Sequence, residues 1–137
     1  SNYLDVDNDA LYPFGYGLSY TTFQYGDIVL NTPTMKQNET ITATIQVTNS
    51  GKYDGAEVVQ LYIRDLVGSI TRPVRELKGF KKIFLKAGES KTVSFKITAD
   101  LLRFYDYDLN QVTEPGEFDI FIGGSSQATK TARLTLK

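Results

Sequence analysis

The sequence predicts an all-β domain, a β-sandwich of about seven short antiparallel strands. Three observations lead to this fold class. Apolar and polar residues alternate at every second position along most of the chain, turn-forming residues recur about every ten positions, and almost no segment shows helical periodicity. The 137 residues fit one domain, and the 41% hydrophobic content is enough for a packed core.

The predicted strands follow from this alternation. They are expected at residues 24–30, 41–48, 56–65, 77–85, 92–97, 118–122 and 132–136. The second and fifth carry a single apolar row, which predicts one buried face, whereas the third is apolar on both faces, as is typical of a central strand. The one helical turn is expected near Asp100, whose side chain would cap a turn that holds Leu101 and Leu102.

Turn-forming residues separate the strands at Asn49-Ser50-Gly51, Ala87-Gly88-Glu89 and Glu114-Pro115-Gly116. Short strands with turns at this spacing are typical of an immunoglobulin or fibronectin type III-like β-sandwich. The chain contains no cysteine and no tryptophan, so the Cys–Trp–Cys signature of antibody domains is absent.

The composition also restricts the chemistry, because histidine is absent as well as cysteine. No imidazole or thiolate can act as nucleophile or base, and neither a structural zinc site nor a disulfide is expected. Carboxylate, lysine and tyrosine chemistry stays open. Asp106 and Asp108 share a strand face, but nothing predicts the desolvation that a catalytic carboxylate pair needs, so we expect solvated loop acids. We assign no catalytic, metal-ligating or cofactor-binding residue.

The net charge of −1 hides three charged regions. Residues 1–27 carry four acids and no base, residues 72–96 carry eight bases and two acids, and residues 100–119 carry six acids and one base. The basic region alternates with apolar residues, so we interpret its lysines as the solvated face of a strand and not as a nucleic-acid contact. No apolar run approaches the ~18 residues that span a membrane, and residues 1–10 lack the apolar core of a signal peptide.

Residues 1–22 are expected to form an extended leader, an interdomain joint, and residues 23–137 the sandwich. Around the leader's glycines and proline lie large apolar side chains, namely Tyr12, Phe14, Tyr16, Leu18, Tyr20 and Phe23. Glycines permit close backbone approach and rings bury large areas, so we expect these six side chains to serve in interdomain packing. They could cover their own sandwich or seal a neighbouring domain, and the sequence favours neither.

Five ordered motifs cover essentially the whole chain. They are residues 13–21 (PFGYGLSYT), 47–51 (VTNSG), 55–62 (GAEVVQLY), 72–80 (RPVRELKGF), and 114–116 (EPG) leading to Phe121-Ile122-Gly123. In these motifs the chain resembles the C-terminal fibronectin type III-like domain of glycoside hydrolase family 3, the family of β-glucosidases and β-xylosidases. The likeness is greatest to bacterial periplasmic β-glucosidases.

The resemblance implies a retaining glycosidase as the parent, with an aspartate nucleophile on an N-terminal barrel and a general acid/base on or near an α/β domain. Neither domain is represented among the motifs of this chain, so no residue here inherits a catalytic role. The expected function is that of a non-catalytic accessory domain in a periplasmic or secreted enzyme that hydrolyses terminal β-D-glucosyl residues. Its expected partners are the catalytic domains of the same parent chain, which it would pack on and stabilise.

Two other functions stay open at this point. A carbohydrate-binding module would need exposed rings, for which Tyr53, Tyr105 and Tyr107 are the candidates, but the absence of tryptophan argues against direct sugar binding. An adhesion or assembly module would instead bind another protein.

Overall fold

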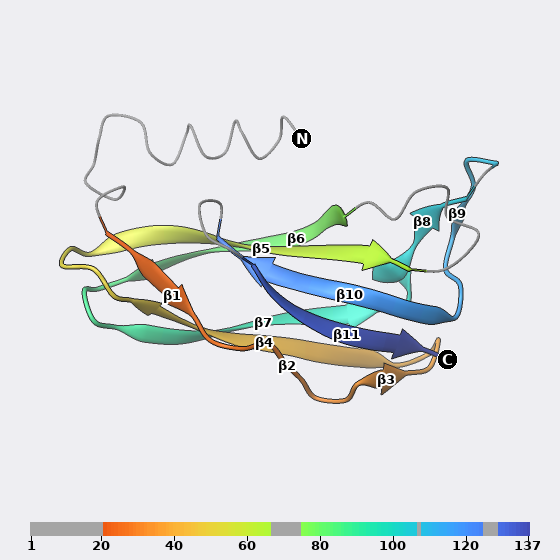
Figure 1. Ribbon diagram of the computed structural model, residues 1–137, viewed down its shortest axis with the longest axis horizontal. Coiled ribbons are helices and arrows are strands. Elements are labelled where there is room, and N and C mark those ends of the chain that lie inside the picture. The colour runs from red at the N-terminus through yellow and green to blue at the C-terminus, as the bar shows by residue number, and fades with distance from the viewer. Residues whose placement is uncertain (1–20, 67–74, 107, 125–128) are drawn as a thin grey trace.

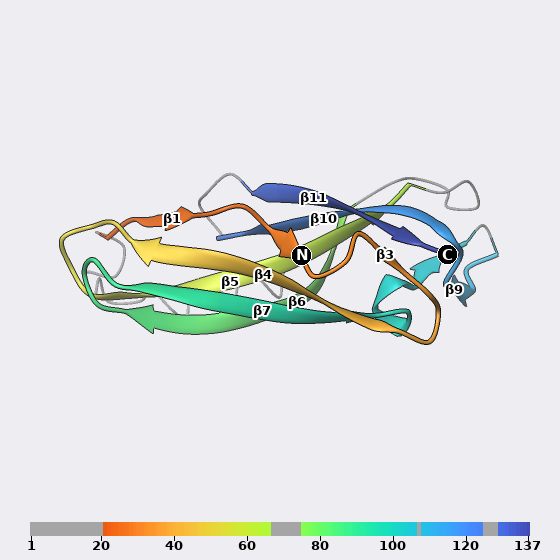
Figure 2. The ribbon, with the colours of Figure 1, turned by 90° about the horizontal axis from the view of Figure 1, so that it is seen from below.

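The computed structural model describes residues 21–66, 75–106, 108–124 and 129–137. Two β-sheets face each other across an apolar core (Figures 1 and 2), which confirms the predicted all-β sandwich. Of the six side chains predicted for interdomain packing, Phe23 falls inside the described ranges. The other five lie outside them: Tyr12, Phe14, Tyr16, Leu18 and Tyr20.

Four antiparallel strands form the first sheet, with β4 at its centre. They are β1 (Phe23–Tyr25), β2 (Val29–Leu30), β4 (Thr40–Asn49) and β7 (Ser90–Thr98). β7 pairs with one edge of β4, and β1 and β2 both pair with its other edge. The predicted strand at 24–30 is therefore two short strands, because Gly26 and Asp27, which are poor strand formers, interrupt the ladder.

Five strands form the second sheet, in the order β3-β11-β10-β5-β6. They are β3 (Thr34–Met35), β5 (Gly55–Asp65), β6 (Arg75–Leu85), β10 (Gly116–Gly123) and β11 (Lys130–Leu136). Neighbouring strands are antiparallel except for β3 and β11, and the β5–β6 ladder contains a bulge at Leu61/Tyr62. β5 lies between β10 and β6, so its prediction as a central strand is confirmed.

A small hairpin lies at one end of the sandwich (Figure 1). The 3-10 turn η3 (Asp100–Leu102) leads into β8 (Phe104–Tyr105), which pairs with β9 (Gln111–Val112). The predicted cap at Asp100 is wrong. Asp100 is already the first residue of the turn, and the backbone N–H of Leu101 instead donates to the Thr98 hydroxyl at 3.3 Å.

The core is built from the alternating rows that the sequence predicts. The fully or nearly buried side chains are Ile41, Ala43, Ile45 and Val47 of β4, Val93, Phe95 and Ile97 of β7, Val59, Leu61 and Ile63 of β5, and Phe118, Ile120 and Ile122 of β10. Each row comes from every second residue of its strand, because successive side chains point to opposite faces. The facing rows of the two sheets thus form one continuous core.

The lysines of β6 depart in part from their prediction as a solvated face. Lys82 is exposed, but the Lys78 ammonium lies 4.3 Å from the centre of the Phe104 ring and the Lys81 ammonium 5.5 Å from that of Phe95. Lys81 is exposed like Lys82, so Lys78, which is half-buried, is the lysine that departs from the prediction.

Candidate functional site

Glu57 is a buried carboxylate near the start of β5, with 3% of its surface exposed. Its Oε2 atom accepts a hydrogen bond from the Tyr25 hydroxyl at 2.9 Å, which links β5 of the second sheet to β1 of the first. Burial raises the pKa of Glu57 above its ordinary value, although hydrogen bonds from Tyr25 and the Val58 backbone oppose the shift. A Cβ atom at Gly124 would collide with this carboxylate. The carboxyl group is therefore enclosed, and its role is to join the two sheets.

Asp106, one of the acids weighed above, organises the turn between β8 and β9. Its Oδ1 atom accepts hydrogen bonds from the backbone N–H groups of Asp108 (2.9 Å) and Asn110 (3.0 Å). Leu109 inside this turn has a left-handed φ of 65°. The carboxylate thus stabilises an unusual backbone conformation. Within the ranges that the structure describes, no group of three potential metal ligands comes together.

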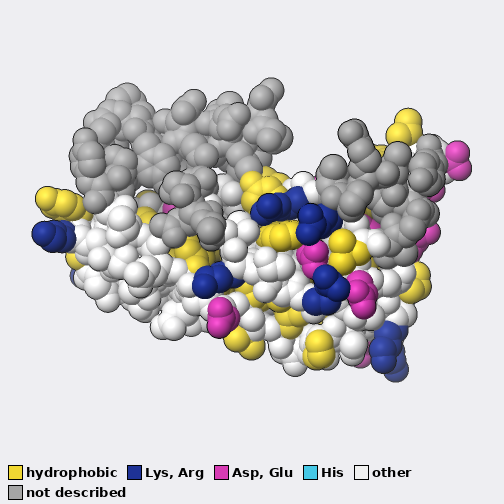
Figure 3. All heavy atoms as spheres, viewed as in Figure 1, with side chains coloured by type: hydrophobic (Ala, Val, Ile, Leu, Met, Phe, Trp, Pro, Cys, Tyr) yellow, Lys and Arg dark blue, Asp and Glu magenta, His cyan; other side chains and the backbone are white. Residues whose placement is uncertain are grey.

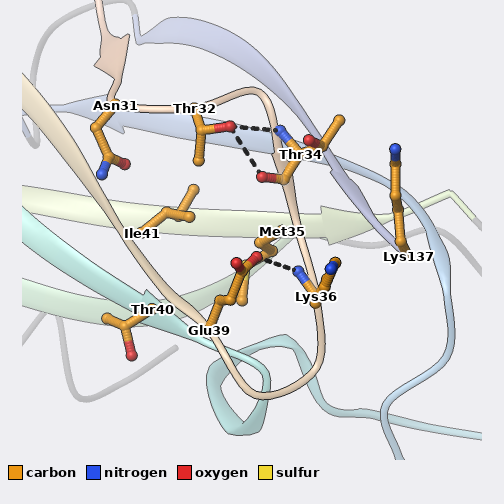
Figure 4. A pocket seen from close by; sticks show the side chains of 9 residues that line it. All are labelled: Asn31, Thr32, Thr34, Met35, Lys36, Glu39, Thr40, Ile41 and Lys137. Carbon is orange, nitrogen blue, oxygen red and sulfur yellow. Dashed lines mark hydrogen bonds between the residues drawn. The ribbon is translucent and has the colours of Figure 1, made fainter.

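An open depression of about 500 Å³ lies beside β3, the start of β4 and the end of β11 (Figure 4). Its polar groups bond to one another: the Lys36 backbone N–H donates to Glu39 Oε1 at 2.7 Å, and the Thr32 hydroxyl donates to the Thr34 carbonyl at 3.0 Å. Glu39 is the one acid among the described residues that line it, and no aromatic ring lines it. The depression therefore offers neither a carboxylate pair nor a platform for a sugar.

The tyrosines proposed as sugar platforms do not form one surface. Tyr53 and Tyr105 are exposed, at 58% and 53%, but Tyr53 lies in the loop between β4 and β5 and Tyr105 in β8, at opposite ends of the sandwich in Figure 1. Tyr107 lies outside the described residues. Phe23, predicted for interdomain packing, is 6% exposed and packs in the core of this sandwich.

Asn49 is a buried junction that sequence reasoning treated only as turn chemistry. Its Oδ1 atom accepts hydrogen bonds from the Thr21 hydroxyl (2.6 Å) and the Gly51 backbone N–H (3.0 Å). Its Nδ2 atom donates to the carbonyls of Tyr53 (2.8 Å) and Leu85 (3.0 Å). These four bonds satisfy the whole amide. They fasten the last leader residues to the end of the sandwich where β5 begins and β6 ends.

The face of the second sheet that points away from the first, here called the outer face, carries a group of apolar side chains outside the core cluster. Ala56, Val58 and Phe121 are 9%, 4% and 6% exposed, and none of them belongs to the core cluster. On the neighbouring strand β6, Phe80 and Phe84 are 40% and 53% exposed. The outer face therefore combines buried apolar side chains on β5 and β10 with exposed rings on β6.

Charged side chains form a network beside these apolar groups. Asp119 accepts hydrogen bonds from Arg64 (3.0 Å) and Arg133 (2.8 Å), and Arg133 also pairs with Glu117 at 2.7 Å. Burial alone would raise the pKa of Asp119, but the two arginines lower it below its ordinary value through hydrogen bonds and charge. Figure 3 shows basic, acidic and hydrophobic side chains side by side on this face.

Two guanidinium groups complete the outer face around the Phe121 ring. The guanidinium carbon of Arg64 lies 5.2 Å from the ring centre and that of Arg75 lies 4.3 Å from it. Arg75 also lies 5.7 Å from the centre of the Tyr62 ring. Such cation–π contacts suit a surface that is partly shielded from water.

The two sheets that face each other across one apolar core define a β-sandwich module. Residues 57–126 match the family model of the fibronectin type III-like domain, and the chain belongs to this family.

Several enzymes contain a close relative of this chain. Over 99% of its length the chain is 49% identical to a periplasmic β-glucosidase of Salmonella typhimurium, and over 96% it is 51% identical to a β-xylosidase of Formosa agariphila. A solved β-glucosidase from Erythrobacter marinus superposes with a TM-score of 0.79 at 39% identity, covering 92% of this chain and 17% of that one. A family 3 β-glucosidase of Bifidobacterium adolescentis gives 0.73 at 34% identity, covering 85% and 17%.

The chain spans 18% of the length of the Salmonella and Formosa relatives. The resemblance to the fibronectin type III-like domain of glycoside hydrolase family 3 is thereby confirmed. Within the described ranges, no helix has the length and apolar character needed to cross a bilayer.

Proposed function

We propose that this chain is the accessory domain of a family 3 β-glucosidase, in which it packs on the catalytic domains and stabilises them without taking part in the reaction. The parent enzyme hydrolyses terminal β-D-glucosyl residues and acts in the periplasm or outside the cell. The name of the Salmonella relative supports both parts of this proposal.

One observation carries the proposal: nearly the whole chain aligns with less than a fifth of each glycosidase relative. A retaining glycosidase holds two carboxyl groups about 5–5.5 Å apart on either side of the scissile bond. The buried Glu57 has Tyr25 and Gly124 around it, and Asp106 stabilises a turn. Both acids have structural roles, which supports the proposal that the catalytic carboxyl pair of the parent enzyme belongs to other domains.

The proposal includes the interdomain joint. Residues 1–22 would connect the sandwich to the preceding domain, with the large side chains of residues 12–20 packed on apolar surface. Thr21 supports this arrangement, because its hydroxyl bonds to the buried Asn49 and holds the end of the leader against the sandwich.

The isolated 137-residue chain provides the test. We expect it to fold but to release no product from an aryl β-glucoside, and to bind no soluble β-glucan in affinity electrophoresis. Turnover that survives purification from an expression host without β-glucosidase would contradict the accessory role. Retardation by glucan that Tyr53→Ala or Tyr105→Ala abolishes would instead favour a carbohydrate-binding module, with Tyr53→Phe as the matched control.

A further inference from the structure

Arg75 is the first residue of β6, lies on the outer face of the second sheet and is exposed. Figure 3 shows basic side chains at the surface of this face. The Nη1 atom of Arg75 donates a hydrogen bond to the Thr129 hydroxyl at 3.3 Å. A guanidinium group has five N–H donors, and the other donors of Arg75 have no acceptor in the described part of the chain. Arg75 is therefore an exposed cation that is largely without hydrogen-bond partners among these residues.

Cross-strand pairing places Arg75 at one end of a row of four charged residues. Arg75 lies opposite Arg64 of β5, Arg64 opposite Asp119 of β10, and Asp119 opposite Arg133 of β11. Each oxygen of Asp119 accepts from one flanking arginine: Oδ2 from Arg64 at 3.0 Å and Oδ1 from Arg133 at 2.8 Å. Arg75 instead has another arginine beside it, and like charges directly opposite each other destabilise a sheet.

The other acids of this neighbourhood are also paired. Glu117 lies 2.7 Å from Arg133, and Glu76 lies 3.3 Å from Lys78. The charged network of the outer face thus contains three guanidinium groups and two carboxylates once Arg75 is included. No carboxylate pairs with Arg75 in the ranges that the structure describes, so the excess positive charge of this network lies on Arg75.

Two aromatic rings hold the guanidinium group of Arg75 in place. Its carbon lies 4.3 Å from the centre of the Phe121 ring and 5.7 Å from that of the Tyr62 ring. Phe121 is 6% exposed, and Arg64 contacts the same ring with its guanidinium carbon 5.2 Å from the centre. A side chain that is held in this way loses less conformational freedom when it binds a partner. Arg75 is thus preorganised for an acceptor that comes from outside the sandwich.

We propose that Arg75 binds the carboxylate of an aspartate or glutamate on the catalytic domains of the parent enzyme. The inference rests on the proposed function, because it names the chemistry of the surface on which this domain would pack. The planar fork of a guanidinium group matches the two oxygens of a carboxylate and forms two parallel hydrogen bonds with it. A carboxylate would also neutralise the excess positive charge of the network.

The surroundings of Arg75 suit a protein partner. Arginine and aromatic residues are enriched at protein interfaces, and the rings of Tyr62 and Phe121 lie beside this guanidinium group. Further along β6, Phe84 is 53% exposed and lies opposite Ala56, on the same face. The outer face therefore offers an apolar area next to a charged anchor, which is the usual composition of an interface.

Two other occupants suit this site less well. A small free anion would gain little, because an ion pair with an exposed arginine is weak in water. A second copy in a two-fold symmetric contact would bring two faces with the same excess charge together. A carboxylate on a different domain avoids this repulsion, and the packed surface around it excludes the water that weakens an ion pair.

A zero-length cross-link on the whole parent enzyme tests the contact. Arg75→Lys replaces a guanidinium group, which does not react with carbodiimides, by an ammonium group, which a water-soluble carbodiimide joins to a carboxylate in direct contact. Peptide mass spectrometry then identifies the two joined residues. Arg103→Lys is the matched control, because Arg103 is also exposed and its Nε atom donates to the Asp100 carbonyl of its own chain at 3.2 Å.

We expect Arg75→Lys to form a cross-link between position 75 and an acid of a catalytic domain. Its yield should exceed that of any interdomain cross-link from position 103 in the control by at least about tenfold, because contact raises the effective concentration of the two groups. A cross-link from position 75 only to Asp119 or Glu117 would show an internal pair and overturn the proposal. A cross-link between two enzyme molecules would assign the face to a second copy and overturn it, as would no cross-link from position 75.

Thermal inactivation of the whole enzyme measures what the contact contributes. Arg75→Met should inactivate about tenfold faster than wild type, because the carboxylate of the partner surface is left without its cation. Arg75→Lys keeps the charge but loses the planar fork, so its rate should lie between the two. Arg103→Met is the control and should stay within about twofold of wild type. An Arg75→Met rate equal to that of this control would overturn the proposal.

Two results separate this inference from the accessory role. If removal of the whole domain leaves the inactivation rate unchanged, the accessory role fails. If removal speeds inactivation while both Arg75 variants behave like their Arg103 controls, the domain packs on the enzyme through other residues. In that case only the carboxylate contact of Arg75 is wrong.

Discussion

Replacing Asn49 with alanine is expected to destabilise the domain by about 4 kcal/mol, because the four hydrogen bonds of this amide, two of them buried and two part-buried, are lost at about 1 kcal/mol each. The side chain is fully buried, and its partners are Thr21, Gly51, Tyr53 and Leu85. No water can replace the amide at the Leu85 carbonyl without opening the end of the sandwich. For a domain of this length, such a loss lowers Tm by roughly 12–16 °C.

Urea unfolding followed by tyrosine fluorescence measures this free energy. Thr21→Val removes a single bond, while Oδ1 of Asn49 keeps the one from Gly51, so we expect a loss of about 1 kcal/mol. Asn38→Ala is the matched control, since Asn38 is exposed and its replacement should change stability by less than about 0.5 kcal/mol. A cost below about 1 kcal/mol for Asn49→Ala would refute the reasoning that this junction fastens the leader to the sandwich.

Three further predictions concern the interior. Burial raises the pKa of Glu57 above 4.5, so this carboxyl group stays protonated to a higher pH in the folded state than in the unfolded state. The free energy of unfolding should therefore fall as pH rises from about 4.5 through the raised pKa, and then level off. Glu57→Gln should lack this fall in urea titrations across pH, and a constant difference from wild type would contradict the shift. Gly124→Ala should cost about 1–3 kcal/mol, because its Cβ meets the Glu57 carboxylate, whereas Gly26→Ala, with ordinary contacts at 3.7 Å, is the control for calorimetry. Phe118→Ala should lower the free energy of unfolding by about 3–5 kcal/mol, because this side chain is fully buried. Phe84, which is 53% exposed, is the control, and Phe84→Ala should cost less than about 1 kcal/mol. Equal losses would show that the core is wrongly assigned.

The long strands could be predicted because burial of one face imposes a period of two on the sequence. The rows beginning at Ile41 and Val93 lie in the core as expected, and β5, apolar on both faces, lies in the middle of its sheet. The strands β3, β8 and β9 have two residues each, too few for an alternation to appear. Their pairing depends on what the rest of the fold places beside them.

Polar residues of the interior were harder to predict. Asn49 bonds to a carbonyl 36 positions away and Glu57 to a hydroxyl 32 positions away, so neither contact leaves a local pattern. The predicted cap at Asp100 was wrong because Asp100 is already the first residue of the turn. The backbone N–H of Leu101 therefore donates to the Thr98 hydroxyl instead. Tyr53 and Tyr105 likewise form no shared sugar platform, because the β4–β5 loop and strand β8 hold them at opposite ends of the sandwich.

Whether this domain stabilises the catalytic domains can be measured on the parent β-glucosidase. The whole enzyme and a version without this chain are compared by the rate of irreversible thermal inactivation, with and without the isolated 137-residue chain added back. We expect faster inactivation without the domain, slower inactivation when the chain is restored, and the same KM for an aryl β-glucoside throughout. Equal inactivation rates with and without the domain would contradict it, as would a loss of substrate affinity at unchanged stability.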